Sequence, residues 1–227
     1  MAKSKKQIQH FSLRKIHPLT HNQERTFQAY DSGKHLMLHG VAGTGKTFIS
    51  MYLALEEVLK QNSRYNKIVV VRSVVPSRDM GFLPGSAKEK AKVYEEPYRE
   101  ICDTLFGRGD GYDILRMKGI VDFTTTSHLR GMTFRDAIVI VDEFQNMNLA
   151  ELDTVITRIG ENCKIIFCGD IRQCDFTKRE EKQGMLTLTK ILDRMNIFEK
   201  VEFDVEDIVR SQLVKNYIIS KLELGIT

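Results

Sequence analysis

The chain has 227 residues, enough for one α/β domain with a substantial core, and its hydrophobic fraction of 42% is ordinary for a globular protein. No apolar run reaches the roughly 18 residues of a membrane span, and no apolar signal core follows the basic start Met1–Lys6. We therefore expect a cytoplasmic protein, and the net charge of +4 permits nucleic-acid binding without arguing for it.

The N-terminal residues 1–17 are polar and basic, which predicts a flexible arm before a single domain of residues 18–227. Thr20 or Asn22 is expected to cap a helix that runs to about Ser32. Gln23 lies in this helix. Because an amide can donate to and accept from an adenine edge together, Gln23 is a candidate for selecting ATP over GTP. The alternative is an exposed, merely solvated glutamine.

The stretch from Gly40 to Thr47 fits the phosphate-binding pattern G-x-x-x-x-G-K-[ST]. An apolar run at residues 35–39 predicts a strand before it, and the apolar spacing of residues 47–61 predicts a helix after it. Loop N–H groups and a helix N-terminus form an anion site that glycines let a phosphate approach. Lys46 is expected to reach the β- and γ-phosphates, and Thr47 to ligate Mg²⁺. The predicted ATP contacts are Gly40, Val41, Ala42, Gly43, Thr44, Gly45, Lys46 and Thr47.

Residues 67–72 form a β-branched run that predicts a buried parallel strand, with Arg72 at its end. Residues 73–87 contain two prolines and two glycines and predict a loop, and a lysine-rich helix is expected from Lys88 to Phe106. Arg72, Arg78 and these lysines are candidates for contacting a sugar-phosphate backbone. A solvated helix face is an equally open interpretation.

A glycine-rich turn at residues 107–111 precedes a predicted strand at residues 120–126 and a polar loop at residues 127–132. Thr126 and Arg130 are further candidates for the nucleic-acid path.

The apolar run of residues 137–141 predicts another buried strand, which ends in Asp142 and Glu143. Together with the phosphate loop, this pair predicts that Asp142 binds Mg²⁺ with Thr47. Glu143 is then expected to orient and deprotonate the attacking water.

The rest of the chain predicts a helix at 149–160, a strand at 163–168, a helix at 186–194, a short strand at 200–203 and a helix at 205–222. Gln173 follows the strand at 163–168 and is expected to sense the γ-phosphate. Arg158 lies near the end of the first of these helices and Arg210 near the start of the last. The four cysteines show no metal-binding spacing, so we expect reduced, mostly buried thiols.

Over residues 18–215 the chain resembles the PhoH family, a single-core branch of P-loop ATPases related to superfamily 1 helicases. The resemblance implies a RecA-like fold, a mostly parallel sheet with helices on both faces. Short members of this kind resemble bacteriophage proteins described as phosphate-starvation-inducible. Val41 and the Val71-Arg72-Ser73 string depart from the family pattern. The strings that carry the resemblance are Gly43–Thr47, Gly81–Gly85, Arg130–Thr133, Asp142–Asn146, Thr157–Gly160 and Gly169–Gln173.

Helicases of this superfamily complete the ATP site with arginines from a second core, for which this chain has no room. The resemblance therefore makes Arg158 and Arg210 candidates for an arginine finger acting on a neighbouring subunit. Such an arrangement implies a ring of identical subunits, which family resemblance suggests is a hexamer.

The combined prediction is a magnesium-dependent ATPase whose hydrolysis is coupled to binding or moving single-stranded RNA or DNA. The competing prediction is a nucleotide-dependent scaffold that moves no strand. Few aromatic side chains fall near the expected path, namely Phe82, Phe123 and Phe134, which weakens the case for base stacking. A small-molecule kinase is the least supported alternative.

Overall fold

The computed structural model describes residues 12–73, 87–129, 131–171 and 179–226, with the side chains of 87–92 and 179–185 excepted. Six strands form one sheet in the order β3-β2-β4-β5-β1-β6, and every neighbouring pair is parallel. All strands therefore end at one edge, where ligands bind in sheets of this kind. The strands are β1 (His35–Gly40), β2 (Lys67–Arg72), β3 (Val121–Thr125), β4 (Ala137–Asp142), β5 (Cys163–Gly169) and β6 (Phe198–Phe203).

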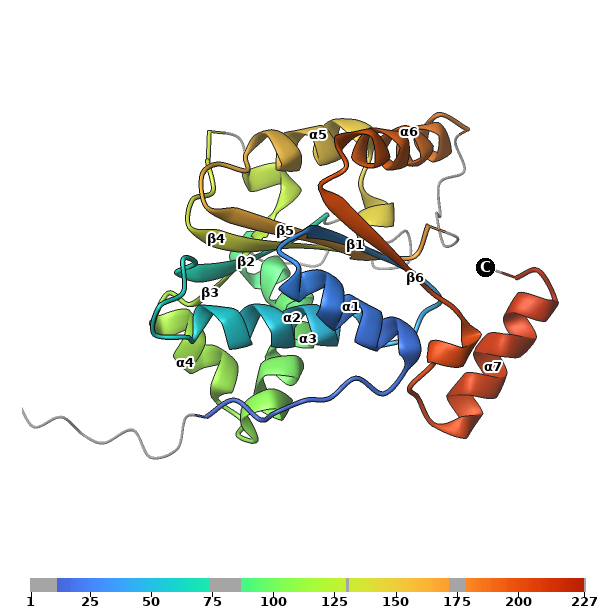
Figure 1. Cartoon of the computed structure of the whole chain (residues 1–227), viewed down its shortest axis with the longest axis horizontal. Helices are drawn as coiled ribbons and strands as arrows, with labels where there is room; N and C mark the ends of the chain where they lie inside the picture. Colours follow the sequence, from blue (N-terminus) through green and yellow to red (C-terminus); the bar gives the residue numbers. More distant parts are fainter. Residues whose placement is uncertain (1–11, 74–86, 130, 172–178, 227) are drawn as a thin grey trace, which may run out of the picture.

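Helices cover both faces of the sheet (Figure 1). One face carries α1 (His21–Asp31), α2 (Lys46–Val58), α3 (Ala87–Phe106) and α4 (Gly111–Met117). The other face carries α5 (Leu149–Thr157) and α6 (Arg179–Met195), while α7 (Gln212–Glu223) stands beside the end of β6. This arrangement is the predicted RecA-like α/β fold.

The central strand β4 explains why the sheet is covered on both sides. All six of its residues are buried. Ile138 and Ile140 pack into the core under α1–α4, and Val139 and Val141 pack into the core under α5 and α6. Because alternate side chains face opposite sides of a strand, an unbroken apolar run requires two covered faces.

Three local predictions differ from the structure. Residues 12–17 are not a free arm, because Leu13 and Ile16 pack against the core and the Arg14 N–H donates to the Leu105 carbonyl at 2.9 Å. The helix α4 was not predicted. The final helix does not begin at Val205: a 3-10 turn of residues 205–207, capped by Asp204, ends at an extended Ile208, and α7 begins only at Gln212.

Within the described ranges, none of the helices has the length and apolar character needed to cross a membrane. Cys102 and Cys168 are buried free thiols, and Cys163 is a half-buried one. Among the same residues no group of three or more His, Cys, Asp or Glu side chains is arranged to hold a metal. Cys174 lies outside the described residues.

Lys164 provides a test of the packing between β5 and α1. Its ammonium group donates to the Tyr30 carbonyl at 2.6 Å, and burial lowers the pKa of Lys164 from 10.5 to about 8. Between these values the unfolded state binds more protons than the folded state, so Lys164 contributes more stability as pH rises. We therefore expect the free energy of unfolding of the unmodified protein, relative to that of Lys164→Met, to rise by on the order of 2 kcal/mol between about pH 8 and pH 10.5. Urea titrations of both proteins at several pH values measure this gain, and a constant difference would contradict it.

Candidate functional site

A cavity of about 510 Å³ opens at the edge where the parallel strands end. It is bounded by the loop after β1, by the ends of β2, β4 and β5, and by one side of α3. The lining residues are Ala42, Gly43, Gly45, Lys46, Thr47 and Phe48 of the loop and α2, Arg72, Asp142, Glu143, Gly169 and Asp170 of the strand ends, Pro97, Glu100, Ile101 and Thr104 of α3, and Arg210.

The loop wraps around the side chain of Lys46, which is 9% exposed. Its ammonium group donates to the carbonyls of Gly40 at 2.9 Å and Val41 at 2.8 Å. Burial lowers the pKa of Lys46, against the attraction of Asp170, Glu143 and Asp142. The Lys46 ammonium group is therefore enclosed by main-chain groups of the loop that the sequence predicts to bind phosphate.

Three predicted contacts, Gly40, Val41 and Thr44, do not line the cavity. A Cβ at Gly40 would overlap the Phe203 main chain, so this glycine lets β1 and β6 approach each other. Thr44 is fully buried and its hydroxyl donates to the Val41 carbonyl at 3.0 Å. These residues shape the loop from beneath it.

Gln23 is 4% exposed and braces the same loop. Its amide nitrogen donates to the Thr44 carbonyl at 3.1 Å, and its amide oxygen accepts the Leu19 N–H at 2.8 Å. The solvated alternative is therefore wrong. The adenine contact stays a prediction, since both ends of the amide already have main-chain partners.

Asp142 receives two hydroxyl groups from opposite sides. Thr47 Oγ1 donates to one carboxylate oxygen at 2.7 Å, and the Tyr98 phenol of α3 donates to the other at 2.7 Å. Burial and then Glu143 raise the pKa of Asp142, while these two hydrogen bonds and the charge of Arg72 oppose the rise. The pair of Thr47 and Asp142 fits Mg²⁺, which takes one or two protein oxygens and completes its shell with phosphate and water.

Arg72 lines this cavity, at the strand end where the sequence places it, and its contact with a nucleic acid stays a prediction. It pairs with Asp142 in the register of β2 and β4. Burial opposes its charge, but Tyr98, Asp142 and Glu143 together raise the pKa of Arg72. The guanidinium group also stacks over the Tyr94 ring, 5.8 Å from its centre.

Glu143 has a left-handed backbone, with φ 51° and ψ 42°. For a residue with a Cβ this conformation costs about 1–2 kcal/mol, and such strain is common at functional sites. The Gln145 side chain donates a short hydrogen bond to the Glu143 carboxylate. The carboxylate thus lies beside Asp142 on a backbone that the adjoining turn holds in an unfavourable conformation.

The two candidate arginine fingers lie in different places. Arg210 lines the cavity of its own chain, beside Gly43, and the neighbouring Val209 N–H donates to the Gly43 carbonyl at 3.1 Å. Within one chain Arg210 thus lies beside the loop of that same chain, and its action on a neighbouring subunit stays a prediction. Arg158 ends α5 at the opposite edge of the sheet, and its Nε is buried without a hydrogen-bond partner among the described residues.

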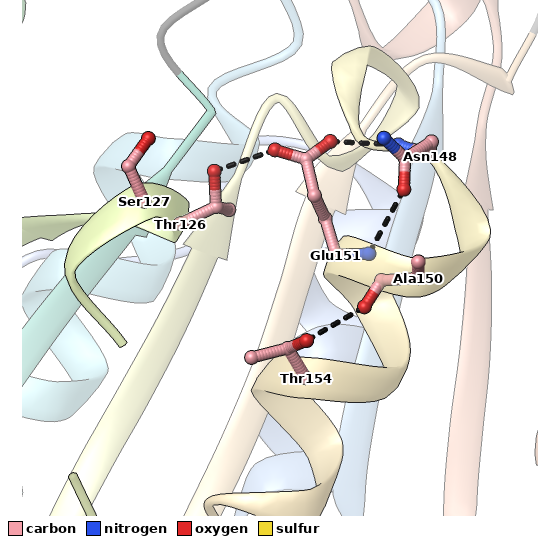
Figure 2. A pocket seen from close by; sticks show the side chains of 6 residues that line it. All are labelled: Thr126, Ser127, Asn148, Ala150, Glu151 and Thr154. Carbon is pink, nitrogen blue, oxygen red and sulfur yellow. Dashed lines mark hydrogen bonds between the residues drawn. The ribbon is translucent and has the colours of Figure 1, made fainter. Parts of the chain in front are cut away.

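A second cavity, of about 440 Å³, lies at the same edge of the sheet as the first, beside β3 and α5. It is lined by Thr126, Ser127, Asn148, Ala150, Glu151 and Thr154. Figure 2 shows Glu151 at its centre, accepting from Thr126 Oγ1 at 2.6 Å and from the Asn148 N–H at 3.0 Å. Ser73, which follows β2, donates to the same carboxylate at 3.1 Å. Thr126 is therefore mostly buried and its hydroxyl is bonded to Glu151, while its contact with a nucleic acid stays a prediction.

Gln173, Arg78 and Arg130 lie outside the described residues. The sequence interpretation missed Tyr98, Asp170 and the wall formed by α3. One signal was available for the wall: Tyr94, Tyr98, Ile101, Cys102 and Leu105 repeat at helical spacing and mark a buried face.

Comparisons of the sequence with known proteins identify the family. The family model described as PhoH-like protein matches residues 15–221. A PhoH-like protein of Bacillus subtilis is 34% identical over 180 residues, covering 79% of this chain and 55% of that protein. Protein PhoH of Escherichia coli is 35% identical over 188 residues, covering 82% of this chain and 52% of that protein. The chain thus spans about half the length of the curated relatives it matches.

Among solved structures, the large terminase of a thermophilic bacteriophage is similar with a TM-score of 0.55. The alignment covers 88% of this chain and 50% of the terminase at 13% identity, which supports the fold alone. The family match and the two relatives go further, and by them this chain belongs to the PhoH-like family, with a RecA-like P-loop core.

Proposed function

We propose that this protein binds and hydrolyses ATP at the cavity between the phosphate loop and Asp142. The observation that carries the proposal is that the start of α2, with Lys46 and Thr47, and the end of β4, with Asp142 and Glu143, meet at that one cavity. A cation, a hydroxyl–carboxylate pair and a further carboxylate are the groups that hydrolysis of a triphosphate requires. The same terminase was also solved in complex with ADP.

In this proposal the loop N–H groups and Lys46 bind the phosphates, and Lys46 leaves its carbonyl partners to do so. Thr47 and Asp142 hold Mg²⁺, which when bound neutralises charge on the phosphate oxygens. Glu143 accepts the proton of the attacking water, and Gln173 senses the γ-phosphate. Arg72 and Arg210 supply positive charge from the same chain. If Arg210 acts on its own loop, the proposed ring of subunits, a hexamer by family resemblance, depends on Arg158.

We further propose that hydrolysis is coupled to single-stranded RNA or DNA lying across the second cavity. Support comes from the position of the second cavity at the edge where the parallel strands end. Arg72 pairs with Asp142 on one side and with Thr125 on the other, and the next residue after Thr125 lines the second cavity. The exposed Ser127 and the half-buried Thr154 provide hydroxyl groups that suit sugar and phosphate oxygens.

The scaffold remains the second candidate because of α7. None of its residues is buried, and it exposes Leu213 at 80%, Tyr217 at 66% and the following Leu224 at 74%. Exposed apolar side chains gathered on one helix favour a protein partner. The carboxylate of Glu151 at the centre of the second cavity also opposes phosphate binding there.

The assignment of Glu143 predicts the effect of Glu143→Gln. The amide keeps the size of the side chain but cannot accept the proton, so we expect kcat to fall by about 10²- to 10⁴-fold. Affinity for a non-hydrolysable ATP analogue should stay unchanged. Steady-state turnover and analogue titration measure the two quantities, with Glu24→Gln on the exposed face of α1 as the matched control. A turnover rate near that of the unmodified protein would remove Glu143 from the mechanism.

The position of Arg210 predicts that it acts within its own chain. Arg210→Ala should reduce kcat by roughly 10²-fold or more, as expected for loss of an arginine that neutralises transition-state charge. Mixing Arg210→Ala with Lys46→Ala should restore no activity, because each chain then lacks one group of its own site. Recovery of turnover in the mixture would show that the arginine serves a neighbouring subunit.

Coupling to a nucleic acid predicts that single-stranded RNA or DNA stimulates ATP turnover, with binding that weakens as salt rises. Thr154→Val should weaken binding by about threefold to tenfold, the effect of losing one hydrogen bond. Thr157→Val is a close control, since both hydroxyls donate to the carbonyl four residues earlier and only Thr154 lines the cavity. Absence of both stimulation and salt-dependent binding would favour the scaffold.

A further inference from the structure

Gln145 is 3% exposed and lies next to the first cavity. Its side chain contacts two residues that line this cavity, Glu143 and Asp170. Its side-chain nitrogen donates to the Glu143 carboxylate. Its side-chain oxygen accepts the Asp170 N–H at 3.0 Å, at the point where β5 ends. One amide therefore joins the proposed catalytic carboxylate to the main chain of the neighbouring strand.

Both partners fix the orientation of this amide. A carboxylate only accepts hydrogen bonds and a main-chain N–H only donates them, so the nitrogen of Gln145 must face Glu143 and the oxygen must face Asp170. An amide supplies the donor and the acceptor from one planar group. A glutamate would keep the acceptor for Asp170 but lose the donor for Glu143.

The surroundings leave room for this amide and little else. A Cβ at Gly169 would overlap both the Gln145 side-chain oxygen and the Phe144 ring. Phe144 is itself fully buried and packs edge-on against Phe167 of β5, with ring centres 5.7 Å apart. The amide of Gln145 is thus enclosed between the short turn of residues 144–146 and the end of β5.

The strand order explains why such a bridge is needed. β5 lies between β1, which carries the phosphate loop, and β4, which carries Asp142. Glu143 follows β4 in a left-handed conformation and is only half-buried, so its backbone alone does not fix the direction of its carboxylate. The charged groups that act on this carboxylate are Lys46, Arg72 and Asp142.

We propose that Gln145 is a positioning residue for hydrolysis: its amide holds the Glu143 carboxylate in register with the end of β5, the strand that leads towards Gln173. Gln145 does not line the cavity in which the phosphates and the metal are proposed to bind. It acts through Glu143, so its loss lowers the rate of the chemical step and leaves nucleotide binding intact. This inference rests on the proposed ATPase activity.

The test is a double-mutant cycle between positions 143 and 145, measured as kcat, KM and affinity for a non-hydrolysable ATP analogue. Gln145→Glu alone should lower kcat by about 10- to 100-fold, the usual effect of losing a group that orients a catalytic ligand. KM and analogue affinity should not change. Gln28→Glu, the same substitution on an exposed part of α1, should match the unmodified protein.

The exchanged variant Glu143→Gln/Gln145→Glu keeps the net charge, the side-chain volumes and a donor–acceptor pair between the two positions. If Gln145 acts through Glu143, its kcat should equal that of Glu143→Gln alone, because residues that act as a unit are not additive. Its thermal unfolding should stay close to that of the unmodified protein.

Three outcomes would overturn the inference: an unchanged kcat in Gln145→Glu, a KM that rises in proportion to the fall in kcat, or losses that multiply in the exchanged variant. A failure of the proposed function appears differently. In that case the unmodified protein itself hydrolyses no ATP, and no variant needs to be compared.

Discussion

The buried carboxylate of Asp142 is the point on which the proposed site depends. It ends the fully buried strand β4 and accepts hydroxyl groups from Thr47, at the start of α2, and from Tyr98, in the middle of α3. A buried charge is costly unless it is paired and hydrogen-bonded, so these contacts fix three elements relative to one another. The loop of residues 40–47, the oxygens proposed to bind Mg²⁺ and the wall of the cavity are thereby held in one arrangement.

The position of β5 between β1 and β4 also shapes the site. Because it separates β1 from β4, Lys46 and Glu143 reach the cavity from strands that are not neighbours. The space over β5 is closed by Gly169 and by the amide of Gln145, which meets the main chain at Asp170. A larger residue than glycine at this point would push Gln145 away from Glu143. The geometry of the proposed water-activating group therefore depends on a residue with no side chain.

The two cavities are joined by one short piece of chain. Arg72 lines the first cavity, and the hydroxyl of the next residue, Ser73, donates to Glu151 in the second cavity. Glu151 also accepts from Thr126 and caps α5 through Asn148. A ligand that moves Glu151 would thus act on the residue beside Arg72, which is a direct route for coupling the proposed nucleic-acid and nucleotide sites.

The sequence by itself predicted the α/β fold class and the six strands, and it singled out the Gly40–Thr47 pattern and the Asp142–Glu143 pair as candidates for the site. It did so because glycine spacing and continuous β-branched runs are local signals with local causes. Only the tertiary structure decided that Arg72 faces Asp142, that Arg210 lies beside its own loop, that Thr126 is bonded internally, and that Tyr98 and Gln145 contact the two carboxylates. Most of those contacts join residues dozens of positions apart or depend on how one strand lies beside another. The contact between Gln145 and Glu143 spans two residues but depends on the left-handed backbone of Glu143, and no periodicity along the chain records any of them.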